Sequence, residues 1–213
     1  MSLDLTANGK RDNDRNLLYR LQSRRPGSFE ELLDLYQKPI YGFVHRMLDD
    51  PSEAPDVTQE VFIKVFCKIG DFRGDSSLKT WLYRIAMREA SNRRRWFSRH
   101  RRKETSMNGS DNENNGLLNR YLVDESQSPF MTAYRREQRK LVENTLRRMD
   151  ERFRTVVILR DIEGLSYNEI AETLRVSLGT VKSRILRGRE MLRSRLPQQA
   201  ADTVPAGAAL QTE

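Results

Sequence analysis

The sequence is poor in the residues that build most chemical sites. It has one cysteine and two histidines in 213 residues, so an internal disulfide is excluded and a zinc site has too few Cys and His ligands. Its longest apolar runs, such as residues 156–159, fall far short of the roughly 20 residues needed to span a bilayer. The N-terminus lacks the basic start and apolar core of a signal peptide. We therefore expect a cytoplasmic protein without a membrane segment, metal or cofactor.

The few candidate reactive residues have simple structural interpretations. Cys67 lies in an apolar helical run and is expected to fill space in the core, because a free cysteine behaves as a small hydrophobe. His45, next to Arg46, is expected on a helix surface. No Gly-rich loop ending in Gly-Lys-Ser/Thr is present. An enzyme acting on nucleic acid, which would need such a site, is therefore disfavoured, and we expect no catalytic residues.

Positive charge is in excess. Lys and Arg number 38 against 30 Asp and Glu, a formal net charge of +8. The expected partner is therefore a polyanion. A two-domain regulator with a sensing N-terminal half would require a receiver-type βα alternation or a pocket-forming sheet, and that half has neither pattern.

Apolar residues recur at helical spacing in two stretches, which predicts an all-α fold of two small helical domains. In the first stretch, a helix is expected to begin at Ser28 in a capping box with Glu31. Another begins near Asp56 and turns Val57, Val61, Phe62, Val65, Phe66 and Ile69 to one face. A polar segment without periodicity separates the stretches. The predicted organisation is a disordered N-terminus (1–13), a first domain (14–102), a flexible polar linker (103–130), a second domain (131–196) and a disordered tail (197–213).

The second domain contains the pattern of a helix-turn-helix. Ser166 and Glu169 can form a capping box for one helix, and Ser177 can cap the next after a short turn. The N-terminal end of such a second helix enters the DNA major groove. Six basic residues and one acid occupy 182–195, which favours this reading over a solvated basic helix of a structural bundle. The candidate DNA-binding residues here are Ser177, Leu178, Thr180, Lys182, Ser183, Arg184 and Arg187.

The last helix of the first domain is strongly basic. Nine Lys or Arg residues and one acid occupy 84–103, interleaved or preceded by aromatic residues. Stacking of an extruded base on an aromatic ring contributes roughly 1–3 kcal/mol. We expect Tyr83 and Trp96 at the surface, and Trp81 in the core. The candidates for contact with separated DNA strands are Lys79, Tyr83, Arg84, Arg88, Asn92, Arg93, Arg94, Arg95 and Trp96.

A polar stripe is expected on the helix that begins near Asp56. Its members, at helical spacing, are Asp56, Gln59, Glu60 and Lys64. It suits a charged partner helix, and the alternative is an ordinary solvated face. An acid/base or metal site is disfavoured because no His or Cys lies nearby to complete it.

The sequence resembles the extracytoplasmic-function sigma factors, the small class of bacterial RNA polymerase specificity subunits. The residues that carry the resemblance are 56–62 (DVTQEVF), 72–74 (FRG) and 80–86 (TWLYRIA) in the first domain, and 179–184 (GTVKSR) in the second. The last of these also resembles response-regulator output domains. Arg88, Ser177 and Pro55 stand where the family usually has Asn, Pro and an acid.

The resemblance implies roles for both domains and for the linker. The first domain would be region 2, which docks on the clamp helices of the largest polymerase subunit through the polar stripe and melts the minus-ten element with the basic helix. The second would be region 4, which reads the minus-thirty-five element and touches the polymerase flap. The linker would run toward the active-site cleft. The implied partners are core RNA polymerase, promoter DNA and an anti-sigma factor.

Overall fold

The computed structural model describes residues 14–101 and 129–196, and every regular element in these two ranges is helical. The all-α prediction is confirmed. The predicted N-terminal segment, the tail and all but the last two residues of the predicted linker lie outside the described residues. Residues 129 and 130, assigned to the linker, belong to a helix.

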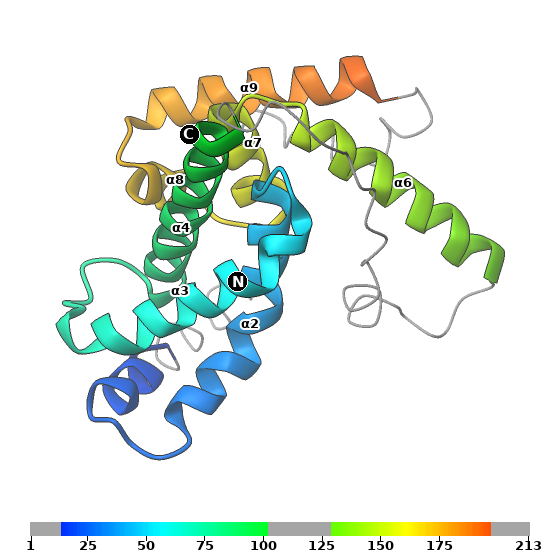
Figure 1. The fold of residues 1–213 in the computed structure, drawn as a ribbon. Coiled ribbons are helices and arrows are strands. Elements are labelled where there is room, and N and C mark those ends of the chain that lie inside the picture. The colour runs from blue at the N-terminus through cyan, green and yellow to red at the C-terminus, as the bar shows by residue number, and fades with distance from the viewer. Residues whose placement is uncertain (1–13, 102–128, 197–213) are drawn as a thin grey trace, which may run out of the picture.

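The N-terminal module (residues 14–101) packs three long helices around one another (Figure 1). After a short helix at 14–22, it contains α2 (Ser28–Met47), η1 (Pro51–Glu53), α3 (Ala54–Lys68), η2 (Ile69–Asp71) and α4 (Leu78–Arg101). The helix α3 turns Val57, Val61 and Val65 inward at a spacing of four residues, and all three are fully buried. Helical periodicity therefore accounts for the packing of α3 on its neighbours.

Phe66, Cys67 and Ser28 of this module differ from their predictions. Phe66 is 54% exposed and Cys67 is exposed, because they follow the inward Val65 and rotate off the buried stripe of α3. The predicted capping box at Ser28 is also wrong. The helix α2 has Gly27 as its N-cap, in a left-handed conformation, and the Ser28 hydroxyl donates to the carbonyl oxygen of Arg25 at 2.6 Å.

The C-terminal module (residues 129–196) contains α6 (Pro129–Arg147), α7 (Glu151–Val157), the π-helical turn η3 (Ile158–Ile162), α8 (Tyr167–Leu174) and α9 (Leu178–Arg195). The helices α7 and α9 cross closely at Gly188, where an added Cβ would lie 2.6 Å from Cγ2 of Val157 and 3.3 Å from the carbonyl oxygen of Phe153. Only glycine allows this approach without displacement of α7.

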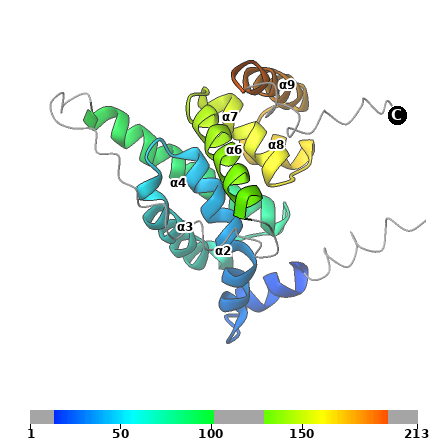
Figure 2. The ribbon, with the colours of Figure 1, turned by 90° about the vertical axis from the view of Figure 1, so that its right-hand side faces the viewer.

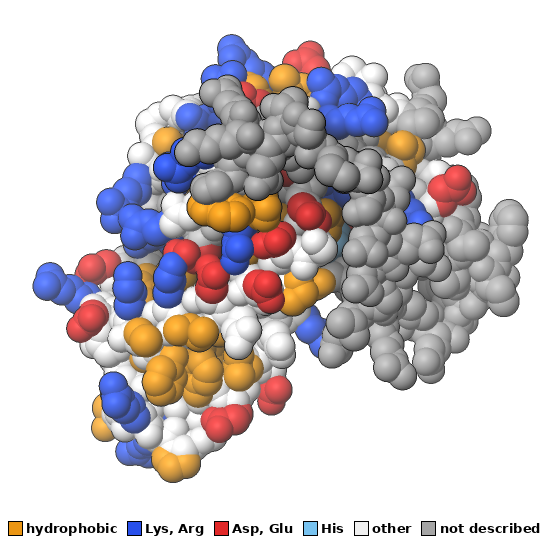
Figure 3. Space-filling model, in the orientation of Figure 1, with side chains coloured by type: hydrophobic (Ala, Val, Ile, Leu, Met, Phe, Trp, Pro, Cys, Tyr) orange, Lys and Arg blue, Asp and Glu red, His pale blue; other side chains and the backbone are white. Residues whose placement is uncertain are grey.

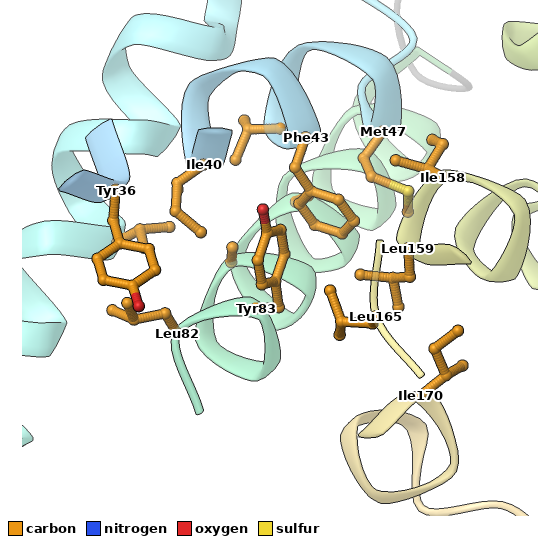
Figure 4. Close-up of a cluster of buried hydrophobic side chains, with 14 of the residues drawn as sticks. Tyr36, Ile40, Phe43, Met47, Leu82, Tyr83, Ile158, Leu159, Leu165 and Ile170 are labelled. Atoms are coloured by element: carbon orange, nitrogen blue, oxygen red, sulfur yellow. The ribbon is translucent and has the colours of Figure 1, made fainter. Parts of the chain in front are cut away.

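The two modules lie against each other and share one hydrophobic cluster, which the sequence did not predict (Figures 1 and 2). Phe43 and Met47 of α2 and Tyr83 of α4 lie beside Ile158 and Leu159 of η3 (Figure 4). The rings of Phe43 and Tyr83 meet edge to face, with centroids 5.3 Å apart. Two separately filled cores were the expectation, and the described residues instead form a continuous one.

Candidate nucleic-acid interface

The C-terminal module contains the predicted helix-turn-helix, formed by α8, a three-residue turn and α9. The Ser166 hydroxyl accepts from the backbone N–H of Glu169 at 3.2 Å, and the Glu169 carboxylate accepts from the backbone N–H of Ser166 at 2.8 Å. This is the predicted capping box. Ser177 caps α9 and accepts from the backbone N–H of Thr180 at 3.1 Å. Arg175 ends α8 with a φ of 54°, in the left-handed region.

The first half of α9 presents most of its predicted DNA-binding side chains to solvent. Ser177, Leu178, Lys182, Ser183 and Arg187 are exposed, and Thr180 and Arg184 are partly buried. Among the described residues, none of the three cations of this half-helix forms an ion pair. Lys and Arg side chains gather along the upper edge of the view in Figure 3, where α9 runs. The surface is available for the phosphates and base edges of a duplex.

Two contacts hold α9 in place without using that surface. The guanidinium of Arg189 donates to both carboxylate oxygens of Asp161 in η3, one of the bonds measuring 3.0 Å. Val181, Ile185 and Leu192 are buried against the rest of the module. The side of α9 that packs against the rest of the module is therefore opposite its cationic side.

The predicted DNA-binding residues of the basic helix α4 fall into two groups that differ in exposure. Arg88, Asn92, Arg95 and Trp96 are exposed. The remaining five are partly or fully buried and contact acidic or backbone groups: Lys79, Tyr83, Arg84, Arg93 and Arg94. Arg93 pairs within its own module, with Glu53 and Glu60, each at 3.0 Å. The other four reach the C-terminal module.

Tyr83 is 1% exposed, so its predicted place at the surface is wrong. Its hydroxyl donates to the Glu163 carboxylate at 2.5 Å, and the Lys79 ammonium donates to the Glu163 carbonyl oxygen at 2.6 Å. Burial raises the pKa of Glu163, while the Tyr83 hydrogen bond and the nearby Arg46 and Lys79 act to lower it. Burial and the Glu163 charge raise the pKa of Tyr83. The contact between Tyr83 and Glu163 could not be predicted from local sequence patterns, because the two residues lie in different modules.

Trp96 stands beside an open polar hollow at the far end of α4. The side chain is 46% exposed and meets Phe97 edge to face, with centroids 4.9 Å apart. The hollow, about 890 Å³, is lined by Glu60, Glu89, Asn92, Arg93, Arg95, Trp96 and Arg99. Trp81 instead stacks on Phe72 at 4.9 Å and packs against the core, close to its prediction. Of the two tryptophans, Trp96 is thus the one available for stacking on a base.

The predicted polar stripe of α3 exists. Asp56, Gln59 and Glu60 are exposed, and Lys64 is half-buried in a short ion pair with Glu89 of α4. Beside Gln59 runs an apolar groove of about 890 Å³ between α2, α3 and the end of η3. Ile63 and Phe66, which are 55% and 54% exposed, line it. The sequence pattern did not indicate either residue as a surface residue.

Other classes of site have no counterpart in the two described ranges. No group of three or more His, Cys, Asp or Glu side chains that could hold a metal ion occurs there. No helix of residues 14–101 or 129–196 is long and apolar enough to cross a bilayer. His45, expected at the surface, is 3% exposed and lies near the positive charge of Arg147 in α6.

Two family models match the chain, one to each module. The model for Sigma-70 region 2 matches residues 32–102, and that for Sigma-70, region 4 matches residues 139–192. Their order and the helix-turn-helix in the second define a sigma factor of the sigma-70 type.

The chain is also similar to curated sigma factors over most of its length. It is 37% identical over 182 residues to the RNA polymerase sigma-H factor of Pseudomonas aeruginosa, covering 85% of this chain and 92% of that one. It is 35% identical over 184 residues to the ECF RNA polymerase sigma-E factor of Haemophilus influenzae, covering 86% and 95%. The chain therefore belongs to the extracytoplasmic-function (ECF) sigma factors. Its family directs promoter-specific transcription by RNA polymerase and consists of initiation factors, not enzymes.

Two solved structures share the fold. CnrH in complex with the cytosolic domain of CnrY gives a TM-score of 0.60 at 23% identity, over 85% of this chain and 95% of that one. The sigma factor RpoE of Bartonella quintana, in complex with the anti-sigma factor NepR, gives 0.62 at 20% identity, over 79% and 96%. The resemblance drawn from the sequence is confirmed.

Proposed function

We propose that the N-terminal module docks on core RNA polymerase and melts the minus-ten element, and that the C-terminal module reads the minus-thirty-five element. The observation that carries the proposal is the capped helix α9, whose exposed Lys182 and Arg187 have no ion-pair partner among the described residues while its opposite side is anchored. Arg or Lys aimed into a major groove contacts guanine edges and phosphates. The remaining reading residues are Ser177, Leu178, Thr180, Ser183 and Arg184.

A double substitution tests the reading helix. Lys182→Ala with Arg184→Ala should weaken binding to the minus-thirty-five element about tenfold or more, because a cation that no longer reaches a phosphate or base contributes neither binding energy nor salt dependence. Arg193→Ala is the matched control, since it removes a cation from an exposed position near the C-terminal end of the same helix. Footprinting of the upstream element by the polymerase holoenzyme gives the answer. Equal protection by the double variant and the control would assign recognition to another helix.

For the minus-ten element we propose the face of α4. The residues that would hold the backbone are Lys79, Arg84, Arg88, Asn92, Arg93, Arg94 and Arg95. Trp96 would contact an unstacked base, whereas Tyr83 is buried. Trp96 is exposed beside a hollow whose lining includes three arginines and two glutamates, and its exposure supports this role. A flipped base needs an aromatic surface and neighbouring donors, and this end of α4 supplies both.

For polymerase docking we propose the stripe of Asp56, Gln59, Glu60 and Lys64, extended by Ile63 and Phe66. An interface of standard size combines charged groups at its rim with apolar anchors at its centre. Ile63→Asp should reduce binding to core enzyme at least tenfold, because it places a charge at an apolar contact. Glu30→Gln, on the exposed first turn of α2, serves as the control. If the Ile63 variant binds core enzyme with unchanged affinity in a pull-down, the apolar residues do not belong to the docking surface.

The same proposal includes an inhibitory partner and a cellular location. The structural relatives are bound to anti-sigma factors or to the cytosolic domain of a second protein, and we infer that this chain too is held by an anti-sigma factor in the cytoplasm. A protein that co-purifies with the chain from its native cells should suppress run-off transcription when added back at equal concentration. Transcription that is insensitive to every co-purified protein would contradict this assignment.

A further inference from the structure

The short helix at 14–22 and the turn that follows it carry an excess of positive charge. Residues 15–25 contain four arginines and no Asp or Glu. Arg20 is neutralised by Glu31, at 2.6 Å. The other three are exposed and form no ion pair with other described residues: Arg15, Arg24 and Arg25. This end of the N-terminal module therefore presents cations to solvent.

An aromatic ring lies among these cations. Tyr19 is 60% exposed, and the Arg25 guanidinium lies over its ring, 5.5 Å from the centroid. Arg15 precedes Tyr19 by four residues, which places both side chains on one face of the helix. Because Arg25 occupies one face of the ring and most of the residue is still exposed, the ring has surface left for stacking. We call Arg15, Tyr19, Arg24 and Arg25 the N-terminal patch.

Backbone contacts, rather than the side chains of the patch, hold this turn in shape. The backbone N–H of Arg25 donates to the Arg20 carbonyl oxygen at 2.9 Å, and that of Arg24 donates to the Leu21 carbonyl oxygen at 3.1 Å. Arg24 has a φ of 51°, in the left-handed region. Leu17 and Leu21 anchor the helix below it and are 1% and 4% exposed. The side chains of the patch are therefore available for a ligand.

One side chain fixes the N-terminal patch beside the start of α4. The Gln22 amide donates to the carbonyl oxygens of Phe72 and Ile69, at 2.6 and 3.3 Å, so the short helix, dark blue in Figure 1, is tied to the segment that leads into α4. The Phe72 ring in turn stacks on Trp81 of α4, with centroids 4.9 Å apart. Arg73, the next residue, is exposed. The patch and the first turns of α4 thus adjoin, and the segment between them adds a cation.

The patch has the composition of a surface that binds single-stranded nucleic acid. Guanidinium groups bind phosphate oxygens, and an exposed aromatic ring stacks on a base. Inside a duplex both faces of a base are covered by its neighbours, so stacking on Tyr19 requires an unpaired strand. The arginines alone would suit an acidic peptide equally well. The ring set among them, and the place of the patch beside α4, favour a nucleic-acid strand.

We propose that the N-terminal patch is a second strand-binding subsite, which holds the unpaired DNA strand where it leaves the first turns of α4 and passes beyond the minus-ten element. Tyr19 stacks on a base, and Arg15, Arg24 and Arg25 hold the phosphates that flank it. The inference rests on the role proposed above for α4. The helix holds the element itself, and the patch holds nucleotides outside it.

The length of the strand separates the patch from α4. Fluorescent single strands carry the minus-ten element of a promoter that the chain transcribes, either alone or with about six further nucleotides at each end. Anisotropy titration with holoenzyme, assembled from the full chain and core polymerase, gives the gain in affinity on extension. This gain should be about three- to tenfold larger for the wild type than for Tyr19→Ala with Arg24→Ala. Both proteins should bind the short strand equally, and contacts of core polymerase with the added nucleotides are common to both.

Two further variants separate stacking from charge. Tyr19→Phe keeps the ring and should retain most of the gain on extension. Arg139→Ala removes one exposed cation of α6 that forms no ion pair with other described residues, which matches the charge change of the Tyr19/Arg24 variant. It should leave the gain at the wild-type value. If Arg139→Ala reduces the gain as much as the Tyr19/Arg24 variant does, the effect is one of net charge and the proposal is overturned.

The short strand distinguishes this inference from the proposed function. If the wild type prefers the element to an unrelated strand of equal length, but the Tyr19/Arg24 variant gains as much from extension, the patch is no subsite and the role of α4 stands. A variant that loses affinity equally for short and extended strands would also overturn a separate subsite. If the wild type shows no preference for the element, the role of α4 fails, and this inference fails with it.

Discussion

The Tyr83 hydroxyl, on α4, donates a 2.5 Å hydrogen bond to the Glu163 carboxylate, 80 residues later in the chain and in the other module. Both side chains are buried, and Arg46 approaches the second carboxylate oxygen at 3.6 Å. A buried carboxylate that loses a donor is left with the uncompensated cost of its desolvation. The pair therefore couples the stability of the module contact to one hydroxyl group.

Replacing Tyr83 by Phe should lower the free energy of unfolding by about 1–3 kcal/mol. The ring and its contact with Phe43 remain, so the loss reports the hydroxyl alone. Urea denaturation followed by circular dichroism measures it. Tyr19→Phe is the control, because Tyr19 is 60% exposed and should tolerate the change within about 0.5 kcal/mol. Equal stability of the two variants would show that the hydrogen bond contributes nothing.

Glycine-to-alanine changes at two positions of α9 should act in opposite directions. At Gly188 the new Cβ would lie 2.6 Å from Val157 and should destabilise the C-terminal module by about 1–3 kcal/mol. At Gly179 the nearest atom is 3.9 Å away, and alanine should stabilise α9 by up to about 1 kcal/mol through its helix propensity. Thermal unfolding of both variants checks the sign. A stabilised Gly188 variant would contradict the close crossing of α7 and α9.

Stability should fall on mild acidification because of His45. Burial, with the positive charges of Arg147 and Arg46, lowers its pKa from 6.5 to about 4. Between these values the unfolded chain binds a proton that the folded chain does not. The contribution of neutral His45 is therefore complete above pH 6.5 and is lost as the pH falls through this window, by up to about 1.4 kcal/mol per pH unit.

His45→Gln removes this titration. Compared at about pH 7 and about pH 5, the wild type should lose more stability than the variant. Glu163, whose pKa is raised, contributes stability with the opposite dependence on pH, and it is present in both proteins. The difference between the two proteins in the slope of stability against pH therefore reports the titration of His45 alone. Parallel slopes would mean that His45 takes up its proton equally in the folded and the unfolded chain, and would contradict the lowered pKa.

Trp96 should affect strand separation without affecting the fold. Trp96→Ala should reduce the fraction of melted promoter about fivefold or more, since a stacked base contributes roughly 1–3 kcal/mol. Trp96→Tyr should restore most of it, because a second aromatic ring provides a stacking surface. Permanganate reactivity of unpaired thymines measures melting. If alanine and tyrosine give the same melting as tryptophan, the stacked base is held elsewhere.

Local signals in the sequence predicted local structure well. The capping box of Ser166 and Glu169 and the cap at Ser177 each involve residues three positions apart, so their partners can be read directly from the chain. The exposed stripe of α3 followed from helical spacing in the same way. These features depend on one element and its ends.

The errors arose where burial depends on distant residues. Tyr83 and His45 are polar-tipped side chains that are buried in the folded chain. Each lies near a residue beyond position 128: Tyr83 donates to Glu163, and the charge of Arg147 acts on His45. Periodicity within one helix cannot show what packs on its outer face. The prediction that Phe66 is buried was wrong for a different reason: α3 has more apolar residues than its buried stripe can hold.

Run-off transcription with purified core RNA polymerase tests the central claim most directly. We predict that transcripts from a promoter of this chain's own regulon appear only when the chain is added. The Lys182/Arg184 variant should lose them, and the Arg193 control should keep them. Transcripts of equal yield with and without the chain would contradict the assignment of both modules.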